Sequence, residues 1–225
     1  MKIAYIFRGH ARTWEQCREN FFNNVHSVFP GDIFIHVWDN LSSSYGSNWN
    51  GFCPLTEHQK SIAESKIDMN AIYKAYQPKV MIVEQDNIKS LGNIPDATAS
   101  RLGLKFMLNA SKKILDEALK YDSYDFVFET RMDVNYTTKV NSDEFSRNSL
   151  VFADVVMGDC VMDFYCIGDV DKIKTKIDFC NHVQKYWYDG DYHTNLYERS
   201  LSAYLRDNSI SWQKSGMSFS VPRIF

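Results

Sequence analysis

The sequence predicts an α/β fold, with a Rossmann-like, mostly parallel sheet flanked by helices and a mixed α+β C-terminal half. Three observations predict this class. Short apolar runs rich in strand formers alternate with segments of helical periodicity through residues 1–135. Two later strand candidates are separated only by residues 157–160, too short a link for the helical crossover that parallel neighbours require. Between these regions, residues 124–134 change from an apolar strand to alternating charges, which is typical of a strand end that meets a ligand.

The first half of the chain alternates strands and helices. Apolar residues at helical spacing follow the first strand, and Pro30-Gly31 ends that helix before the apolar run Asp32–Trp38. The order strand, helix, strand favours parallel strands joined by crossovers. In chain order we expect strands at 2–7, 32–38, 78–83 and 125–133, and helices at 14–29, 56–76 (one helix or two) and 97–121.

The pattern changes in the second half. Strands at 150–156 and 161–167 lie so close in the sequence that they form a hairpin or a bent meander. Helices at 169–187 and 195–206 follow, and 212–221 is an irregular strand or a tail. Because no linker, repeat or low-complexity tract interrupts the chain, we expect a single domain over 1–225, with halves at 1–135 and 136–225.

Composition excludes several classes of protein. The net charge of −3, without a basic block, argues against nucleic acid as a partner. No run of 18 apolar residues predicts a membrane span, although peripheral membrane contact stays open, and the N-terminal segment is predicted to be a strand and not a signal peptide. The five cysteines are odd in number and lack a CxxC pair, so we expect reduced thiols in a cytoplasmic protein. The 15% aromatic residues can line a sugar or base cleft, but filling the core is the simpler explanation.

The charged end of the central strand is the strongest candidate site. Glu129, Arg131 and Asp133 alternate, so on an extended chain all three side chains point to one side. Carboxylate oxygens suit Mg²⁺ or Mn²⁺, and a guanidinium fork suits phosphate oxygens. The alternative is an ion-pair cluster at a strand end, in which Arg131 pairs with Glu129 or Asp133.

Two other strand ends carry candidate residues. Arg8 and Arg12 lie in the first strand-to-helix turn, where doubly wound folds bind phosphate or nucleotide. The G-x-G-x-x-G pattern of dinucleotide sites is missing there. Asp39 ends the second strand, at the same edge of the predicted sheet. The alternatives are that Arg8 is a solvated strand end and that Asp39 only starts a turn.

This arrangement resembles the GT-A fold of nucleotide-sugar glycosyltransferases, and in particular a subgroup of bacterial and viral polysaccharide glycosyltransferases. The resemblance lies in RGHART at Arg8–Thr13, in DIFIHVWD at Asp32–Asp39 and in YDFVFETRMD at Tyr124–Asp133. It implies a UDP- or GDP-sugar donor in the first half, with Asp39 in contact with its base or ribose, and a glycan or glycolipid acceptor in the second half. It also implies Mn²⁺ or Mg²⁺ held on the diphosphate by Asp133. Because Glu129-x-Arg131-x-Asp133 replaces the usual D-x-D, a metal-independent enzyme is also open.

Carboxylates in the second half are candidates for the base that would accept the proton of the acceptor hydroxyl. Asp163 stands inside an apolar strand, where a carboxylate must be exposed or partnered. Glu198 and Asp159 are its rivals, and the resemblance makes His193 a candidate late metal ligand. The sequence therefore predicts a glycosyltransferase of surface polysaccharide or glycan synthesis. A nucleotidyltransferase and a non-catalytic carbohydrate-binding module are the alternatives.

Overall fold

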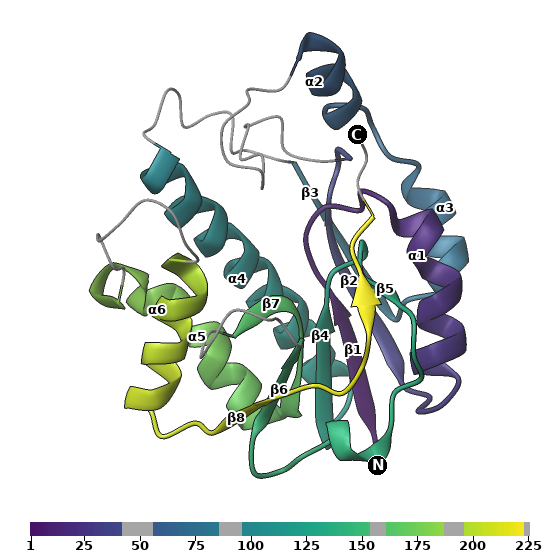
Figure 1. Ribbon diagram of the computed structural model, residues 1–225. Helices are drawn as coiled ribbons and strands as arrows, with labels where there is room; N and C mark the ends of the chain where they lie inside the picture. The colour runs from purple at the N-terminus through teal and green to yellow at the C-terminus, as the bar shows by residue number, and fades with distance from the viewer. Residues whose placement is uncertain (42–55, 86–95, 154–160, 187–195, 223–225) are drawn as a thin grey trace.

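The computed structural model describes residues 1–41, 56–85, 96–153, 161–186 and 196–222 (Figure 1). A seven-stranded sheet runs through the centre, in the order β3-β2-β1-β4-β7-β6-β8. Its strands are β1 (Ile3–Phe7), β2 (Asp32–Trp38), β3 (Val80–Glu84), β4 (Phe126–Thr130), β6 (Leu150–Ala153), β7 (Met162–Asp169) and β8 (Trp212–Lys214). A separate pair joins β5 (Asn135–Tyr136) to β9 (Phe219–Ser220).

The directions of the strands confirm an α/β fold with a mostly parallel sheet. Neighbours β3, β2, β1 and β4 pair in parallel. Strand β7 is antiparallel to both β4 and β6, and β8 then pairs with β6 in parallel. The predicted close pairing of the two strands after residue 135 is therefore confirmed as β6 and β7.

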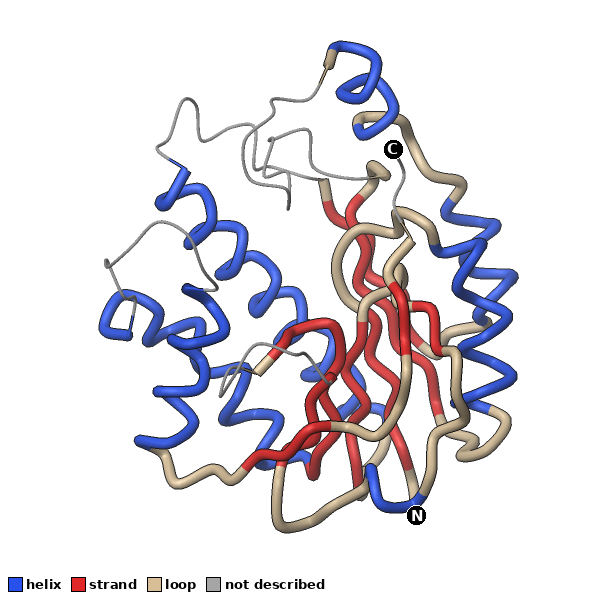
Figure 2. The backbone as a smooth tube through the Cα atoms, in the orientation of Figure 1, coloured by secondary structure: helices blue, strands red, loops and turns tan. Residues whose placement is uncertain are grey.

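Helices cover both faces of the sheet (Figures 1 and 2). Helices α1 and α3 pack on one face, and α4, α5 and α6 lie on the other. The long first helix of the prediction is shorter, because α1 ends at Phe21 and continues as a π-helix over Phe22–His26. The bounds are α1 (Trp14–Phe21), α2 (Glu57–Ala63), α3 (Met69–Tyr76), α4 (Asp96–Tyr121), α5 (Val170–Tyr186) and α6 (Leu196–Asp207), with a 3-10 turn over Ser142–Glu144.

Alternation along the strands divides the core into two layers. In β4, Phe126 and Phe128 belong to the layer under α1 and α3, and Val127 belongs to the layer under α4 and α5. The first layer is rich in aromatic rings: Phe128 packs against Tyr5, Tyr136 and Tyr165. The surplus of aromatic residues therefore fills the core, as the simpler explanation predicts.

The order of the strands reverses between β1 and β4. From β1 the chain continues outward to β2 and β3, then crosses back to β4 on the other side of β1. In open α/β sheets a reversal of this kind opens a crevice beyond the carboxyl ends of the two strands. Because β7 is antiparallel to β4, the beginning of β7 lies at this same end of the sheet. The residues after β1 and β4 and the first residues of β7 therefore meet there.

Two smaller expectations concern cysteines and membranes. Cys17, Cys166 and Cys180 are buried free thiols, and Cys53 and Cys160 lie outside the described residues. Within the described ranges, none of the helices has the length and apolar character needed to cross a bilayer.

The aromatic layer provides a test of the packing. Phe128 is fully buried in β4, so Phe128→Ala should lower the free energy of unfolding by about 3–5 kcal/mol through lost burial and a cavity. Urea denaturation measures the change. Tyr73→Ala is the control, because this side chain is 53% exposed and its loss should cost within about 0.5 kcal/mol. Equal effects in the two variants would contradict the assigned core.

Candidate functional site

The carboxyl ends of β1 and β4 and the beginning of β7 are held together by backbone hydrogen bonds. The Arg8 N–H donates to the Thr130 carbonyl at 3.0 Å, and the Arg131 N–H donates to the Phe164 carbonyl at 3.2 Å. These bonds extend the strand pairing past the regular ends of the strands. Residues from three separate parts of the sequence are thereby fixed together at one edge of the sheet, the edge that the sequence predicts.

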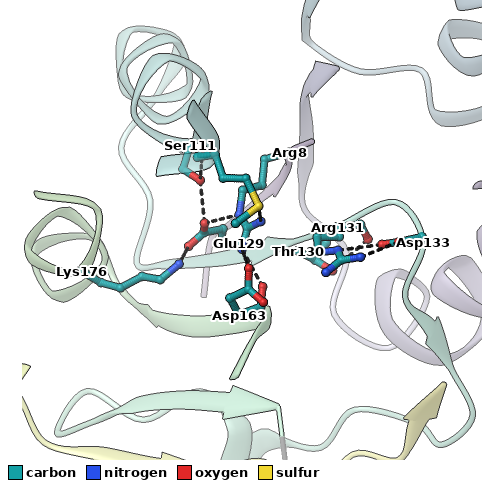
Figure 3. A network of polar contacts seen from close by, with 9 residues as sticks. Arg8, Ser111, Glu129, Thr130, Arg131, Asp133, Asp163 and Lys176 are labelled. Atoms are coloured by element: carbon teal, nitrogen blue, oxygen red, sulfur yellow. Dashed lines mark hydrogen bonds and ion pairs between the residues drawn. The ribbon is translucent and has the colours of Figure 1, made fainter. Parts of the chain in front are cut away.

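A fully buried carboxylate, Glu129, lies next to the last residue of β4, at this end of the sheet (Figure 3). Its Oε1 accepts hydrogen bonds from Arg8 Nε at 2.7 Å and from Ser111 Oγ of α4 at 2.6 Å. Its Oε2 pairs with the ammonium group of Lys176, on α5. Arg8, Ser111 and Lys176 are each at most 1% exposed, so β1, β4, α4 and α5 meet at one dry ionic cluster.

The electrostatics of this cluster keep Glu129 ionised. Burial by itself raises the pKa of the carboxyl, but the attraction of Lys176 and Arg8 outweighs burial and lowers the pKa to about 2. A carboxylate with this pKa does not exchange protons near neutral pH. Glu129 is therefore suited to holding its two cations in place and not to acid-base chemistry.

Arg8 connects the ionic cluster to β7. Its Nη2 donates to the carbonyl of Asp163 at 2.6 Å and lies 3.6 Å from Oδ2 of the same residue. The alternative of a solvated strand end is wrong for Arg8, since the side chain is 1% exposed. Asp163 is 5% exposed and partnered, which is one of the two states that its place in an apolar strand predicts. The guanidinium of Arg8 faces the protein interior, where it positions Asp163.

A second ionic cluster forms around Asp133. Arg131 binds its carboxylate with both arms of the fork, from Nε to Oδ1 at 2.8 Å and from Nη2 to Oδ2 at 2.6 Å. Arg12 adds a hydrogen bond from Nη1 to Oδ2 at 3.2 Å. Burial raises the pKa of Asp133, but the two guanidinium groups outweigh it and lower the pKa to about 2. The structure thus shows the alternative of an ion pair for Arg131, with Asp133 as the partner.

The turn after β1 has an unusual backbone that delivers Arg12 to this cluster. Gly9 adopts φ +100°, and Arg12 adopts φ 37°, a left-handed conformation that is uncommon for a residue with a side chain. The Arg12 N–H donates to the Leu41 carbonyl at 3.1 Å. Such a conformation costs on the order of 1 kcal/mol or more, so the surrounding contacts must hold it. Strained residues of this type concentrate at functional sites.

A pair of carboxylates forms the third part of the site. Glu198, in the first turn of α6, is 6% exposed and lies close enough to Asp163 for their charges to interact. Burial and then the charge of Asp163 raise the pKa of Glu198 to about 7. Asp163 also interacts electrostatically with Arg12 and Arg131. Asp163 therefore stands between the guanidinium groups and a carboxyl group that can exchange a proton near neutral pH.

The expectation that Glu129, Arg131 and Asp133 point to one side is wrong. Strand β4 ends at Thr130, and Met132 and Asp133 form a turn, so the alternation of an extended chain stops after Glu129. Glu129 faces Ser111, Arg8 and Lys176, whereas Arg131 and Asp133 pair with each other (Figure 3). Glu129 therefore pairs with Arg8 and Lys176, and Arg131 pairs with Asp133.

The remaining predicted residues lie in different places. Asp39 follows β2 at the same edge of the sheet, and its carboxylate pairs with Lys66. Asp159 and His193 lie outside the described residues.

Lys176 was not predicted, although it falls at helical spacing on the inward face of α5, three residues after Ile173. A lysine on an apolar helix face is the sequence signal for a buried ionic partner.

The donor set of Asp133 does not fit a divalent cation. Its oxygens accept three hydrogen bonds from guanidinium groups, and a carboxylate has about four lone-pair positions. Two positive side chains at this distance also repel a metal ion. Within the described part of the chain, no three His, Cys, Asp or Glu side chains group closely enough to hold a metal. The contacts of Asp133 therefore suit a carboxylate that orients two arginines, and they do not suit a ligand of Mn²⁺ or Mg²⁺.

The sequence was compared with known proteins. Neither a protein-family model nor a curated protein matches the chain.

The buried ionic cluster gives the first prediction for the site. Glu129→Gln leaves Arg8 and Lys176 without their shared anion, and the free energy of unfolding at pH 7 should fall by about 3–5 kcal/mol. Because the folded pKa is about 2 and the unfolded value is 4.5, this stabilisation is present above pH 4.5 and is lost as the pH falls towards 2. Denaturant titrations should show a smaller difference in free energy of unfolding between the parent protein and Glu129→Gln at pH 3 than at pH 7. Glu117→Gln, which breaks an exposed pair with Lys120, should stay within about 0.5 kcal/mol of the parent.

Glu198 should behave in the opposite way. Its folded pKa of about 7 lies above the unfolded value of 4.5, so the parent protein loses stability as the pH rises from 4.5 to 7. Glu198→Gln removes this loss and should raise the free energy of unfolding at pH 8 by up to about 3 kcal/mol, with little change at pH 4. Glu57→Gln, at a site 89% exposed, is the control. A variant less stable than the parent at pH 8 would contradict the raised pKa.

Proposed function

We propose that this protein is a glycosyltransferase that moves a sugar from a nucleotide-diphosphate donor to a hydroxyl of a glycan or glycolipid. Its main support is the placement of a proton-accepting carboxyl, Glu198, beside Asp163 and opposite two arginines, at the crevice where the strand order reverses. Acyl, phosphoryl or glycosyl transfer each needs a base on the acceptor and positive charge on the leaving group. The motif resemblance at Arg8–Thr13, Asp32–Asp39 and Tyr124–Asp133 selects glycosyl transfer among them.

In the proposed reaction the first half of the chain binds the donor and the second half supplies the base. The guanidinium groups of Arg12 and Arg131 stabilise the negative charge that develops on the departing diphosphate. Glu198 takes the proton of the acceptor hydroxyl as that oxygen attacks the anomeric carbon, which corresponds to an inverting transfer. Burial and then the charge of Asp163 raise the pKa of Glu198, so the base works close to neutral pH. Arg8 holds Asp163 in position.

Binding experiments test this function directly. Isothermal titration with UDP-, GDP- and other nucleotide sugars, with and without Mn²⁺, should detect binding of at least one donor, and slow hydrolysis of that donor should follow. No binding of any nucleotide together with no hydrolysis would refute the proposal. Release of pyrophosphate from a nucleoside triphosphate would instead favour the nucleotidyltransferase. Sugar binding that Asp133→Ala leaves unchanged, without a diphosphate site, would favour a carbohydrate-binding module.

The pH dependence of turnover provides a sharper prediction. With Glu198 as base, kcat/KM for donor turnover should rise with pH and level off above about 7, following the pKa of the free enzyme. Glu198→Gln should lower kcat by about 10²- to 10⁴-fold. Asp163→Asn removes the charge that raises the pKa of Glu198, so the rising limb should shift to lower pH. Glu57→Gln, which changes a remote and exposed side chain, should show the same dependence of kcat/KM on pH as the parent. If the rise of kcat/KM with pH were unchanged in both Glu198→Gln and Asp163→Asn, Glu198 would be ruled out as the base.

A further inference from the structure

Two arginines from separate parts of the chain converge on one carboxylate at the mouth of the crevice. Arg131 follows β4, donates hydrogen bonds to Asp133 and packs against the ring of Phe164, whose centroid is 5.2 Å from its guanidinium carbon. Arg12 is delivered by the strained turn after β1. Asp133 is 1% exposed, whereas the side chain of Arg12 is 31% exposed and that of Arg131 is 11% exposed. The carboxylate is thus buried, whereas both arginine side chains keep some exposure to solvent.

Both guanidinium groups retain donors for a further anion. Asp133 is the only hydrogen-bond acceptor that their side chains have among the residues that the structure describes. It occupies Nη1 of Arg12 and the Nε–Nη2 edge of Arg131. The remaining N–H groups, including Nε and Nη2 of Arg12 and Nη1 of Arg131, match the multiple oxygens of a phosphate.

Several backbone N–H groups at the start of α1 already have partners within the turn. In glycine-rich phosphate loops, free N–H groups at a helix N-terminus bind the anion. Here the Trp14 N–H donates to the Ala11 carbonyl at 2.8 Å, and the Gln16 N–H donates to the Thr13 carbonyl at 3.0 Å. The first turn of α1 therefore satisfies these two donors internally, and the side chains of Arg12 and Arg131 supply positive charge at this edge of the sheet.

We infer that the crevice binds the diphosphate of its ligand through the guanidinium groups of Arg12 and Arg131, with Asp133 orienting both, and that this binding requires no divalent cation. The inference rests on the proposed function, because it concerns the same donor site. It assigns to the two arginines the neutralisation that a metal ion performs in the glycosyltransferases that the sequence resembles. Asp133, expected to be a metal ligand, becomes a positioning residue.

The test uses the full chain and free nucleoside diphosphates as probes. Isothermal titration with UDP and with GDP is carried out in EDTA and again in excess Mn²⁺. The affinity of the preferred nucleotide should change by less than about threefold between the two conditions. Arg12→Gln and Arg131→Gln should each weaken binding by about 10- to 100-fold in EDTA, which is the loss of one or two charged hydrogen bonds. Arg147→Gln is the matched control, because Arg147 is 66% exposed and pairs with Asp125 just before β4 begins, at the opposite end of the strand.

Three results would overturn the inference, and they differ in what they say of the function. Binding that appears only with Mn²⁺ overturns metal independence and leaves the glycosyltransferase intact. Binding in EDTA that both arginine variants retain places the diphosphate elsewhere. No binding of any nucleotide or nucleotide sugar in either buffer refutes the proposed function itself. Arg12→Lys, which keeps the charge but not the fork, and thermal unfolding of each variant separate lost binding from lost folding.

Discussion

The rest of the structure depends on the buried carboxylate of Glu129. Moving an ion from water into the protein interior costs several kcal/mol, so well-placed opposite charges and hydrogen-bond donors must offset this cost. Arg8, Ser111 and Lys176 meet this requirement from three different elements around β4. Losing any charged partner leaves an uncompensated charge, whereas hydrophobic contacts tolerate small shifts. The cluster therefore specifies how α4 and α5 sit on the sheet more strictly than the surrounding apolar residues do.

This rigid base supports a crevice whose carboxylates have different properties. Glu129 and Asp133 have pKa values of about 2, because each is held by two cations. Glu198 has a pKa of about 7, because burial and a neighbouring carboxylate act on it in the same direction. Arg8 links the two regions, since it binds both Glu129 and Asp163. The surrounding charges, and not the residue type, thus decide that Glu129 and Asp133 stay ionised while Glu198 can exchange a proton.

Periodicity predicted the strands and helices well, because burial of one face leaves a repeat in the sequence. Charges after an apolar strand likewise predicted the edge of the sheet where Arg8, Arg131 and Asp163 meet. What could not be predicted was the direction of Glu129 relative to Arg131, which depends on where the strand ends, and the partner of Glu129, which lies 47 residues away in Lys176. A lysine on the inward face of a helix predicts a buried anionic partner. Only the packing of α5 on the sheet determines which carboxylate that partner is.

The proposed reaction couples the arginines to the base through charge. A donor diphosphate brings negative charge into the crevice, and negative charge near Glu198 raises its pKa further, as that of Asp163 already does. An uncompensated diphosphate would therefore keep Glu198 protonated and unable to accept a proton at neutral pH. Arg12 and Arg131, when they bind the diphosphate, cancel much of this effect. Neutralising the leaving group and keeping the base ionisable are then one electrostatic requirement, which Arg12 and Arg131, both held by Asp133, can meet together.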